Sequence, residues 1–303
     1  MMRPRFRSSA SLVPAITVFT CLFFATGAMA QSGTESKKLR QFGEPRGRAP
    51  DGWPAFDWEK KREVLFNFYG PSEPEKKFIA NAAPTQPLVT PKEPRRLLVF
   101  YRCQYPHASI ATANEAYQQI ASASKAFEVT FSDDPADIND KNLKQYDALL
   151  LNNTTDWDVT VGESGRNAIV SFVQSGKGLV GIHAAADSCK TWREGFEMIG
   201  GRFSCHPWLP AGTWAFELES PSHPLNRPFG NSGFWLRDEI YDYHTGSHLR
   251  SRSRVLVGLD MDRIENVNAK EIRTGLEHLV TTDQPHPVAW IHGYGDGRVF
   301  YSN

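Results

Sequence analysis

Short runs rich in apolar residues alternate with segments of helical apolar spacing between residues 97 and 182. The runs predict strands, and they are Leu97–Tyr101, Phe127–Phe131, Ala148–Leu151 and Leu179–Ile182. Residues 109–126 and 166–174, which lie between these runs, have the apolar spacing of helices. Strands that alternate with helices are typical of a parallel sheet that is covered by helices on both faces. We therefore predict an α/β fold for this part of the chain.

The pattern changes after Trp208. Residues 212–219 alternate between apolar and polar side chains, and residues 254–259 and 287–292 are further apolar runs. Gly295–Arg298 predicts a hairpin turn into a last strand at Val299–Tyr301. These features predict antiparallel strands added to the sheet in the C-terminal half.

Three of the earlier strands lead directly into residues that can form hydrogen bonds. His107 comes shortly after the first strand, Asn153 and Thr154 follow the third, and His183 ends the fourth. In open α/β sheets, ligands bind outside the carboxyl ends of the strands. We therefore expect these groups to converge on one rim of the sheet and to form a pocket there.

Residues 176–181 match the glycine pattern G-x-G-x-x-G. A dinucleotide site needs these glycines after a strand and at the start of a helix. Here they follow a predicted helix and precede a strand, so Gly176 is expected to end the helix and Gly178 to lie in a turn. The pattern therefore does not indicate a nicotinamide cofactor.

The N-terminus has the pattern of a secretory signal peptide. Arg3, Arg5 and Arg7 precede an apolar run from about residue 12 to residue 25, and Ala28–Ala30 forms a cleavage pattern. The apolar run is too short to span a bilayer. We expect residues 1–30 to be removed, the mature protein to be periplasmic or extracellular, and no membrane association after cleavage.

Residues 31–93 are rich in proline, glycine and charged residues, which is typical of an arm or linker. Residues 73–83 predict one short helix within this segment. We expect the segment to form an arm over the main domain, residues 94–303, rather than a separate fold.

Charge and cysteine content exclude some function classes. Lys plus Arg and Asp plus Glu both number 34, so the chain lacks the positive charge typical of a nucleic-acid binder. Beyond the predicted signal peptide, Cys103, Cys189 and Cys205 form no C-x-x-C pair, which argues against a thiolate zinc site.

Several motifs together resemble the ThuA-like family, which is associated with trehalose utilisation and is related to the class I glutamine amidotransferase fold. They are RRLLVFYRCQYPHASI at 95–110, NLKQYDALLLNNTT at 142–155, GKGLVGIHAAADS at 176–188, GG with HPW at 200–208, HP at 223–224, DEIY at 238–241 and residues 287–301. The resemblance extends from Arg95 to the end of the chain. It implies a flavodoxin-like three-layer α/β sandwich with a mostly parallel sheet, plus antiparallel additions in the C-terminal half. The family pattern continues with Leu-Gly-His and a closing helix, so we expect the sequence to be truncated at its C-terminus.

The resemblance also implies a function. We expect an exported carbohydrate-active protein, a hydrolase or isomerase, that acts on a small-molecule sugar or oxidised sugar by acid–base chemistry of histidine and carboxylate. In the related amidotransferases, a nucleophilic cysteine lies on a sharp turn from strand to helix. The matching position here is His183 or a neighbour, so glutaminase chemistry is not predicted.

Four residues are candidates for catalysis. His183 ends a buried strand, and Asp187 would orient its imidazole or cap the following helix, two roles that the sequence leaves open. His206 precedes a proline, which favours an extended conformation. Glu239 lies among aromatic residues, where an apolar environment raises the pKa of a carboxyl group and suits it to general acid or base catalysis.

Six residues are candidates for substrate binding. Trp208 would form a wall against a sugar ring, and strand alternation would turn only one of Asp238 and Glu239 inward. The full set is His107, Asn153, Thr154, Trp208, Asp238 and His244.

Three alternatives remain open. The protein could be a carbohydrate-binding module without turnover, or an amidotransferase-type hydrolase that uses Cys189 or Cys103. A divalent metal is the third alternative, although no H-x-x-x-H or H-x-H spacing supports it and the sequence assigns no cofactor. The ligands to test for such a metal are His107, His183, His206 and Glu239.

Overall fold

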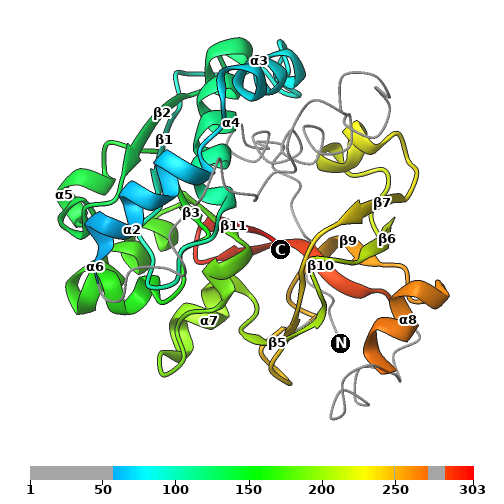
Figure 1. Cartoon of the computed structure of the whole chain (residues 1–303). Coiled ribbons are helices and arrows are strands. Elements are labelled where there is room, and N and C mark those ends of the chain that lie inside the picture. The colour runs from blue at the N-terminus through cyan, green and yellow to red at the C-terminus, as the bar shows by residue number, and fades with distance from the viewer. Residues whose placement is uncertain (1–56, 249, 272–283) are drawn as a thin grey trace.

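The computed structural model describes residues 57–248, 250–271 and 284–303 (Figure 1). The predicted signal peptide and the arm up to residue 56 lie outside the described residues. None of the described helices is long and apolar enough to span a membrane.

One half of the main sheet is parallel, as the sequence predicts. In this half the strand order is β2-β1-β3-β4-β11, and every neighbouring pair runs in the same direction. The strands are β1 (Arg96–Phe100), β2 (Glu128–Ser132), β3 (Ala148–Asn152), β4 (Gly178–Ile182) and β11 (Gly297–Ser302). Asn152 pairs with Ile182, so β3 and β4 end level with each other. The next residues of both strands, Asn153 and His183, therefore leave the sheet at the same edge.

The other half of the sheet is antiparallel and continues the order β11-β10-β9-β6-β7. These strands are β10 (His286–Tyr294), β9 (Arg254–Leu259), β6 (Thr213–Leu218) and β7 (Phe234–Arg237). A separate two-stranded sheet pairs β5 (Phe203–Trp208) with β8 (Ile240–Tyr243). The predicted antiparallel additions in the C-terminal half are thus confirmed.

Helices cover both faces of the parallel strands. Side chains of successive strand residues point to opposite faces, and β1 shows the result: Leu97 and Val99 pack in the same core cluster as Tyr117 of α4. Leu98 and Phe100 pack in the other cluster, which contains residues of α6. The arrangement confirms the three-layer α/β sandwich (Figure 1). The helical segments of residues 109–271 are α4 (Ser109–Ser124), η5 (Pro135–Asp137), α5 (Asp140–Leu143), α6 (Trp157–Gln174), η6 (His183–Ala186), α7 (Arg193–Ile199), η7 (Pro224–Phe229) and α8 (Ile264–Glu271).

Helix α6 begins earlier than the sequence predicts. The apolar spacing indicates a start near Arg166, but the helix extends back to Trp157, with an interruption at Gly162, where φ is 66°. Only glycine adopts this conformation without a steric penalty. Trp157 is fully buried and anchors the added turns, so tertiary packing extends the helix beyond its periodic part.

The described part of the arm packs on the main domain. It contains α2 (Trp58–Val64), the π-helix η4 (Leu65–Tyr69) and α3 (Glu73–Ala82), which confirms the predicted short helix. The indole Nε1 of Trp58 donates a hydrogen bond of 2.7 Å to Asp133. The fully buried Leu65 belongs to a small apolar cluster that includes Ile110 of α4.

The structure predicts loss of stability in mild acid. Burial lowers the pKa of His248 and of His286 to about 4 each, from an ordinary value of 6.5. Between pH 6.5 and 4 the unfolded chain therefore binds more protons than the folded chain, and stability falls as the pH falls. We expect the free energy of unfolding to be lower at pH 5 than at pH 7 by about 1–2 kcal/mol for each histidine.

Urea unfolding at the two pH values measures this difference. His248→Gln should reduce it, whereas His244→Gln, at an exposed position, should change it little. An unfolding free energy that is equal at pH 5 and pH 7 would contradict the prediction.

Candidate functional site

His183 lies on a sharp turn between β4 and η6. Its φ angle is 43°, in the left-handed region that costs a non-glycine residue about 1–2 kcal/mol. The Tyr301 hydroxyl donates a hydrogen bond of 2.8 Å to the His183 carbonyl, and the Trp157 indole donates one of 3.1 Å to the Ala185 carbonyl. These bonds hold the turn in its strained conformation, so the imidazole has a fixed position at the sheet edge.

Small residues around the turn are required by its packing. Ala184, Ala185 and the following Ala186 are fully buried or nearly so. A Cβ atom on Gly181 would lie 3.2 Å from the Tyr301 ring and 3.3 Å from Ala185, closer than ordinary van der Waals contact. The run of small residues after β4 therefore lets the chain turn directly against β11.

Glu239 reaches the same place from the C-terminal half. It lies between β7 and β8, and its backbone carbonyl accepts a hydrogen bond of 2.6 Å from the Asn303 side-chain amide. The Asn303 side-chain oxygen accepts a bond of 3.0 Å from the backbone N–H of Tyr241. Asn303 follows directly after β11, so the strand that supports His183 also positions Glu239. The sequence gives no sign of the roles of Tyr301 and Asn303, because nothing in it places β11 beside β4.

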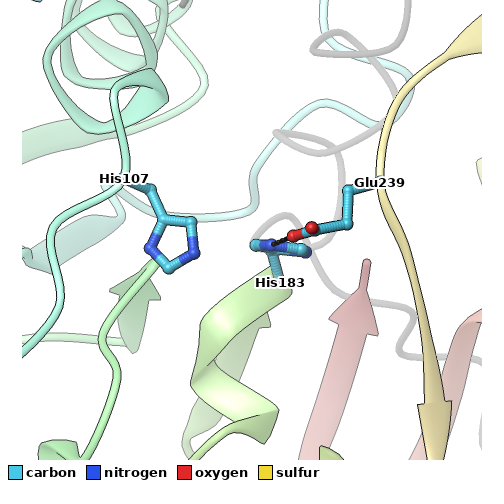
Figure 2. Close-up of side chains that lie close together, drawn as sticks. All are labelled: His107, His183 and Glu239. Carbon is cyan, nitrogen blue, oxygen red and sulfur yellow. Dashed lines mark ion pairs between the residues drawn. The ribbon is translucent and has the colours of Figure 1, made fainter. Parts of the chain in front are cut away.

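His183 and Glu239 form the closest polar pair of the site. The Nε2 atom of His183 lies 3.3 Å from Oε2 of Glu239, and Figure 2 shows the two side chains facing each other. His206 Nε2 lies 3.8 Å from the same oxygen. The side chain of His206 is 37% exposed, whereas those of His183 and Glu239 are 13% and 22% exposed. The pair is therefore sheltered, and His206 is its more solvent-accessible neighbour.

His107 completes the group from the end of β1. Its ring centroid lies 5.0 Å from that of His183 in an edge-to-face arrangement, and Figure 2 shows the ring directed toward His183. Burial and the nearby charge of His183 lower the pKa of His107 to about 3. His107 is therefore a neutral imidazole at physiological pH.

The electrostatic environment keeps Glu239 ionised. Burial of Glu239 favours its neutral form, but the hydrogen bond and charge of His183, together with the charge of His206, outweigh burial. The pKa of Glu239 is therefore lowered, which is the opposite of the raised pKa that its aromatic neighbours suggest from sequence. Glu239 is suited to accept a hydrogen bond or hold a cation, rather than to donate a proton.

Aromatic rings support the site from one side. The Tyr241 ring lies 4.0 Å from that of His183 and 4.3 Å from that of Phe203, and Phe203 lies 4.6 Å from the His206 ring. Burial raises the pKa of Tyr241, so its phenol stays neutral. The rings restrict the imidazoles to fixed orientations and lower the local dielectric constant, which strengthens the histidine–carboxylate pair.

Three predicted binding residues lie in the protein interior. Trp208 is fully buried, and its indole donates a hydrogen bond of 2.9 Å to the Asn266 carbonyl, so it cannot form a wall against a sugar. Asn153 and Thr154 are 4% and 0% exposed. They leave β3 at the expected edge, but the amide of Asn153 bonds the neighbouring Asn152. Both side chains are therefore buried and are not presented to a ligand.

The remaining candidates have different surroundings. Asp187 forms an ion pair of 3.5 Å with Lys190, and it does not cap α7, whose N-cap is Trp192. Asp238 is exposed, and its carboxylate accepts a bond of 2.8 Å from the backbone N–H of Glu239. His244 is exposed and follows the far end of β8. Because β8 extends about 3.3 Å per residue, His244 and Glu239 lie at opposite ends of the strand.

Cys103 and Cys189 are not placed for nucleophilic chemistry. Cys103 and Cys189 are 3% and 1% exposed. Burial raises the pKa of Cys103 to about 12 and that of Cys189 well above its ordinary value. A nucleophilic thiol needs a lowered pKa and access to substrate, so both thiols are structural.

The geometry predicts how Glu239 responds to loss of its partner. In His183→Ala, the hydrogen bond and charge that lower the pKa of Glu239 are lost while most of its burial remains. The pKa of Glu239 should therefore rise. Carboxyl ¹³C NMR during a pH titration measures this change, and His244→Ala is the control that should leave the pKa unchanged. An unaltered Glu239 titration in His183→Ala would show that the pair does not form in solution.

A second prediction concerns the strained turn. Tyr301→Phe removes the hydroxyl that bonds the His183 carbonyl. We expect the free energy of unfolding to fall by about 1–2 kcal/mol, because a half-buried carbonyl loses its partner. Denaturant unfolding tests this, with Tyr105→Phe, at a 63% exposed tyrosine, as the matched control. Equal losses in the two variants would contradict a specific role for the Tyr301 hydroxyl.

Comparisons with known proteins agree with this fold. Among solved structures, the chain is similar to a ThuA-like protein from Bacteroides uniformis, with 21% identity and a TM-score of 0.54 over 71% of this chain and 84% of that one. It is also similar to a ThuA-like protein from Parabacteroides merdae, with 17% identity and a TM-score of 0.49 over 69% and 79% of the two chains. No curated protein matches the sequence significantly. The ThuA family model, described as trehalose utilisation, matches residues 96–303, and the chain therefore belongs to the ThuA family.

Proposed function

We propose that this protein is an exported enzyme that acts on a sugar or an oxidised sugar by proton transfer at His183. The observation that carries the proposal is the sheltered contact of 3.3 Å between His183 Nε2 and Glu239 Oε2. A carboxylate that orients an imidazole is a recurring arrangement in general acid–base catalysis.

The ionised carboxylate determines which nitrogen of His183 is basic. Because Glu239 accepts a hydrogen bond at Nε2, that nitrogen carries the proton, and Nδ1 has the free lone pair. Nδ1 would accept a proton from a sugar hydroxyl or from carbon next to a carbonyl. Glu239 would stabilise the imidazolium that forms, and the imidazolium would return the proton later in the reaction.

The surroundings of the pair support a polyhydroxylated substrate. His107 is neutral, so one imidazole can both donate and accept hydrogen bonds. Asp238 is an exposed residue beside Glu239, and its carboxyl group can accept hydrogen bonds from hydroxyl groups. Tyr105 is 63% exposed, and its ring lies 5.9 Å from that of His107. The exposed ring of Tyr105 would therefore form the surface for a sugar ring that the sequence led us to expect from Trp208.

The family description is the second line of support. The ThuA model is described as trehalose utilisation, so a sugar or a modified sugar is the substrate class to test. The N-terminal pattern of a signal peptide adds export to the proposal.

The test combines turnover and binding on a panel of disaccharides and their keto derivatives. We expect Glu239→Gln and His183→Ala to lower turnover by about a hundred- to ten-thousandfold, the contribution typical of acid–base catalysis. Binding of the same sugar, measured by calorimetry, should weaken far less, because the substituted groups act mainly on the transition state.

Glu128→Gln is the matched control, because Glu128 is an exposed carboxylate at the start of β2, the opposite end of the strand from the site. Its turnover should equal that of the wild type. Sugar binding with no turnover on any member of the panel would show a binding protein instead of an enzyme. Loss of turnover on alkylation of Cys103 or Cys189 would favour the amidotransferase-type reaction.

A further inference from the structure

We propose that His107, His183 and Glu239 form a binding site for one divalent transition-metal ion. Among the described residues, these three side chains each offer a ligand atom, and the three atoms lie within 4.8 Å of one another. They come from the loop between β1 and α4, from the end of β4 and from the segment before β8, and Figure 2 shows all three directed toward a common point. Two histidines and one carboxylate are a recurrent ligand set for such ions.

The distances suit a small coordination sphere. Ligands about 2.0–2.1 Å from a tetrahedral zinc ion are about 3.4 Å apart. The contact of 3.3 Å between His183 Nε2 and Glu239 Oε2 already has this length. The three ligand atoms lie within 4.8 Å of one another, so His107 completes the set if its nitrogen moves by about 1.4 Å or less, which a side-chain rotation provides.

The charges of the three groups also favour an ion. A metal ligand must be deprotonated, and two imidazoles and one carboxylate can all bind an ion in that form. In their metal-binding forms, the two imidazoles and the carboxylate carry a net charge of minus one, and all three side chains are half-buried. Binding of a divalent cation would change the net charge of the site from minus one to plus one. The cation would take the place of the proton that His183 Nε2 otherwise shares with Glu239.

The ligand types select the kind of ion. Calcium and magnesium prefer oxygen ligands, and magnesium keeps most of its water. Imidazole nitrogen favours zinc, iron, cobalt, nickel or copper, and the absence of thiolate from this ligand set argues against a purely structural zinc site. Three protein ligands leave a coordination position for a substrate oxygen, as in catalytic sites.

The role of the ion, though not its binding, rests on the function proposed above. The ion would act as a Lewis acid on a sugar carbonyl or hydroxyl oxygen. His183 would then be a ligand, and His206, which is 3.8 Å from Glu239 and more exposed, would be the group available for proton transfer.

Metal binding can be measured without any activity assay. We would treat the untagged full chain with a chelator, remove the chelator, and titrate with zinc by calorimetry and with cobalt(II) by visible absorption. We expect one ion per chain and cobalt bands typical of a low-coordinate site with nitrogen ligands. His107→Ala and Glu239→Gln should each weaken zinc binding at least about a hundredfold. Loss of a residue that only hydrogen-bonds a metal ligand can lower metal affinity by about a hundredfold, and loss of the ligand itself should lower the affinity at least as much.

His244→Ala and Glu128→Gln are the controls, because they remove the same side-chain types at exposed positions. Both should bind zinc as the wild type does. Circular dichroism shows whether each variant folds, and His107→Gln, which preserves the size of the side chain, replaces His107→Ala if that variant does not fold.

The outcomes separate this inference from the proposed function. Absence of stoichiometric zinc and cobalt binding, or binding that is equal in wild type, His107→Gln and Glu239→Gln, overturns the metal site. If the metal site is overturned while Glu239→Gln still abolishes sugar turnover, the metal-free acid–base function stands. One ion per chain with no sugar turnover would support the metal site and contradict the proposed function.

Discussion

The parallel pairing of β4 with β11 determines the geometry of the whole site. Tyr301 pairs with Gly181 and Ser302 pairs with Ile182, so the end of β11 lies directly beside the strained turn at His183. From this position the Tyr301 hydroxyl bonds the His183 carbonyl, and Asn303 bonds the backbone on both sides of Ile240. The two halves of the site are distant in sequence, but both are attached to the same strand. Their relative position is therefore as rigid as the sheet.

Rigidity matters because the site concentrates imidazoles around one carboxylate. His183 and His206 both lie within 4 Å of the same oxygen of Glu239, and His107 packs against His183. Burial and mutual repulsion keep His107 neutral, while the neighbouring imidazoles keep Glu239 ionised. The proposed proton transfer and the proposed metal site would both use the contact between His183 and Glu239.

The residues that the sequence analysis misplaced show how packing competes with function. Trp208 and Glu239 are both site candidates from the sequence, yet Trp208 enters the core and Glu239 faces His183. A buried tryptophan removes a large apolar area from water and needs one partner for its indole N–H, which the Asn266 carbonyl provides. An ionised carboxylate is costly to bury without charged partners. Each side chain therefore lies where its own desolvation cost is lowest.

The sequence alone determined the strand-and-helix alternation, and with it the parallel strands β1, β3 and β4. Because parallel strands end at the same edge of the sheet, the sequence also determined that His107 and His183 would meet at that edge. Only the tertiary structure decided that Glu239 and His206 join them, that Asn153 is buried, and that Tyr301 and Asn303 anchor the site. The reason is that β11 pairs with β4 although more than a hundred residues separate them in the chain. Local periodicity specifies each strand, but the choice of its partner depends on how the complete core packs.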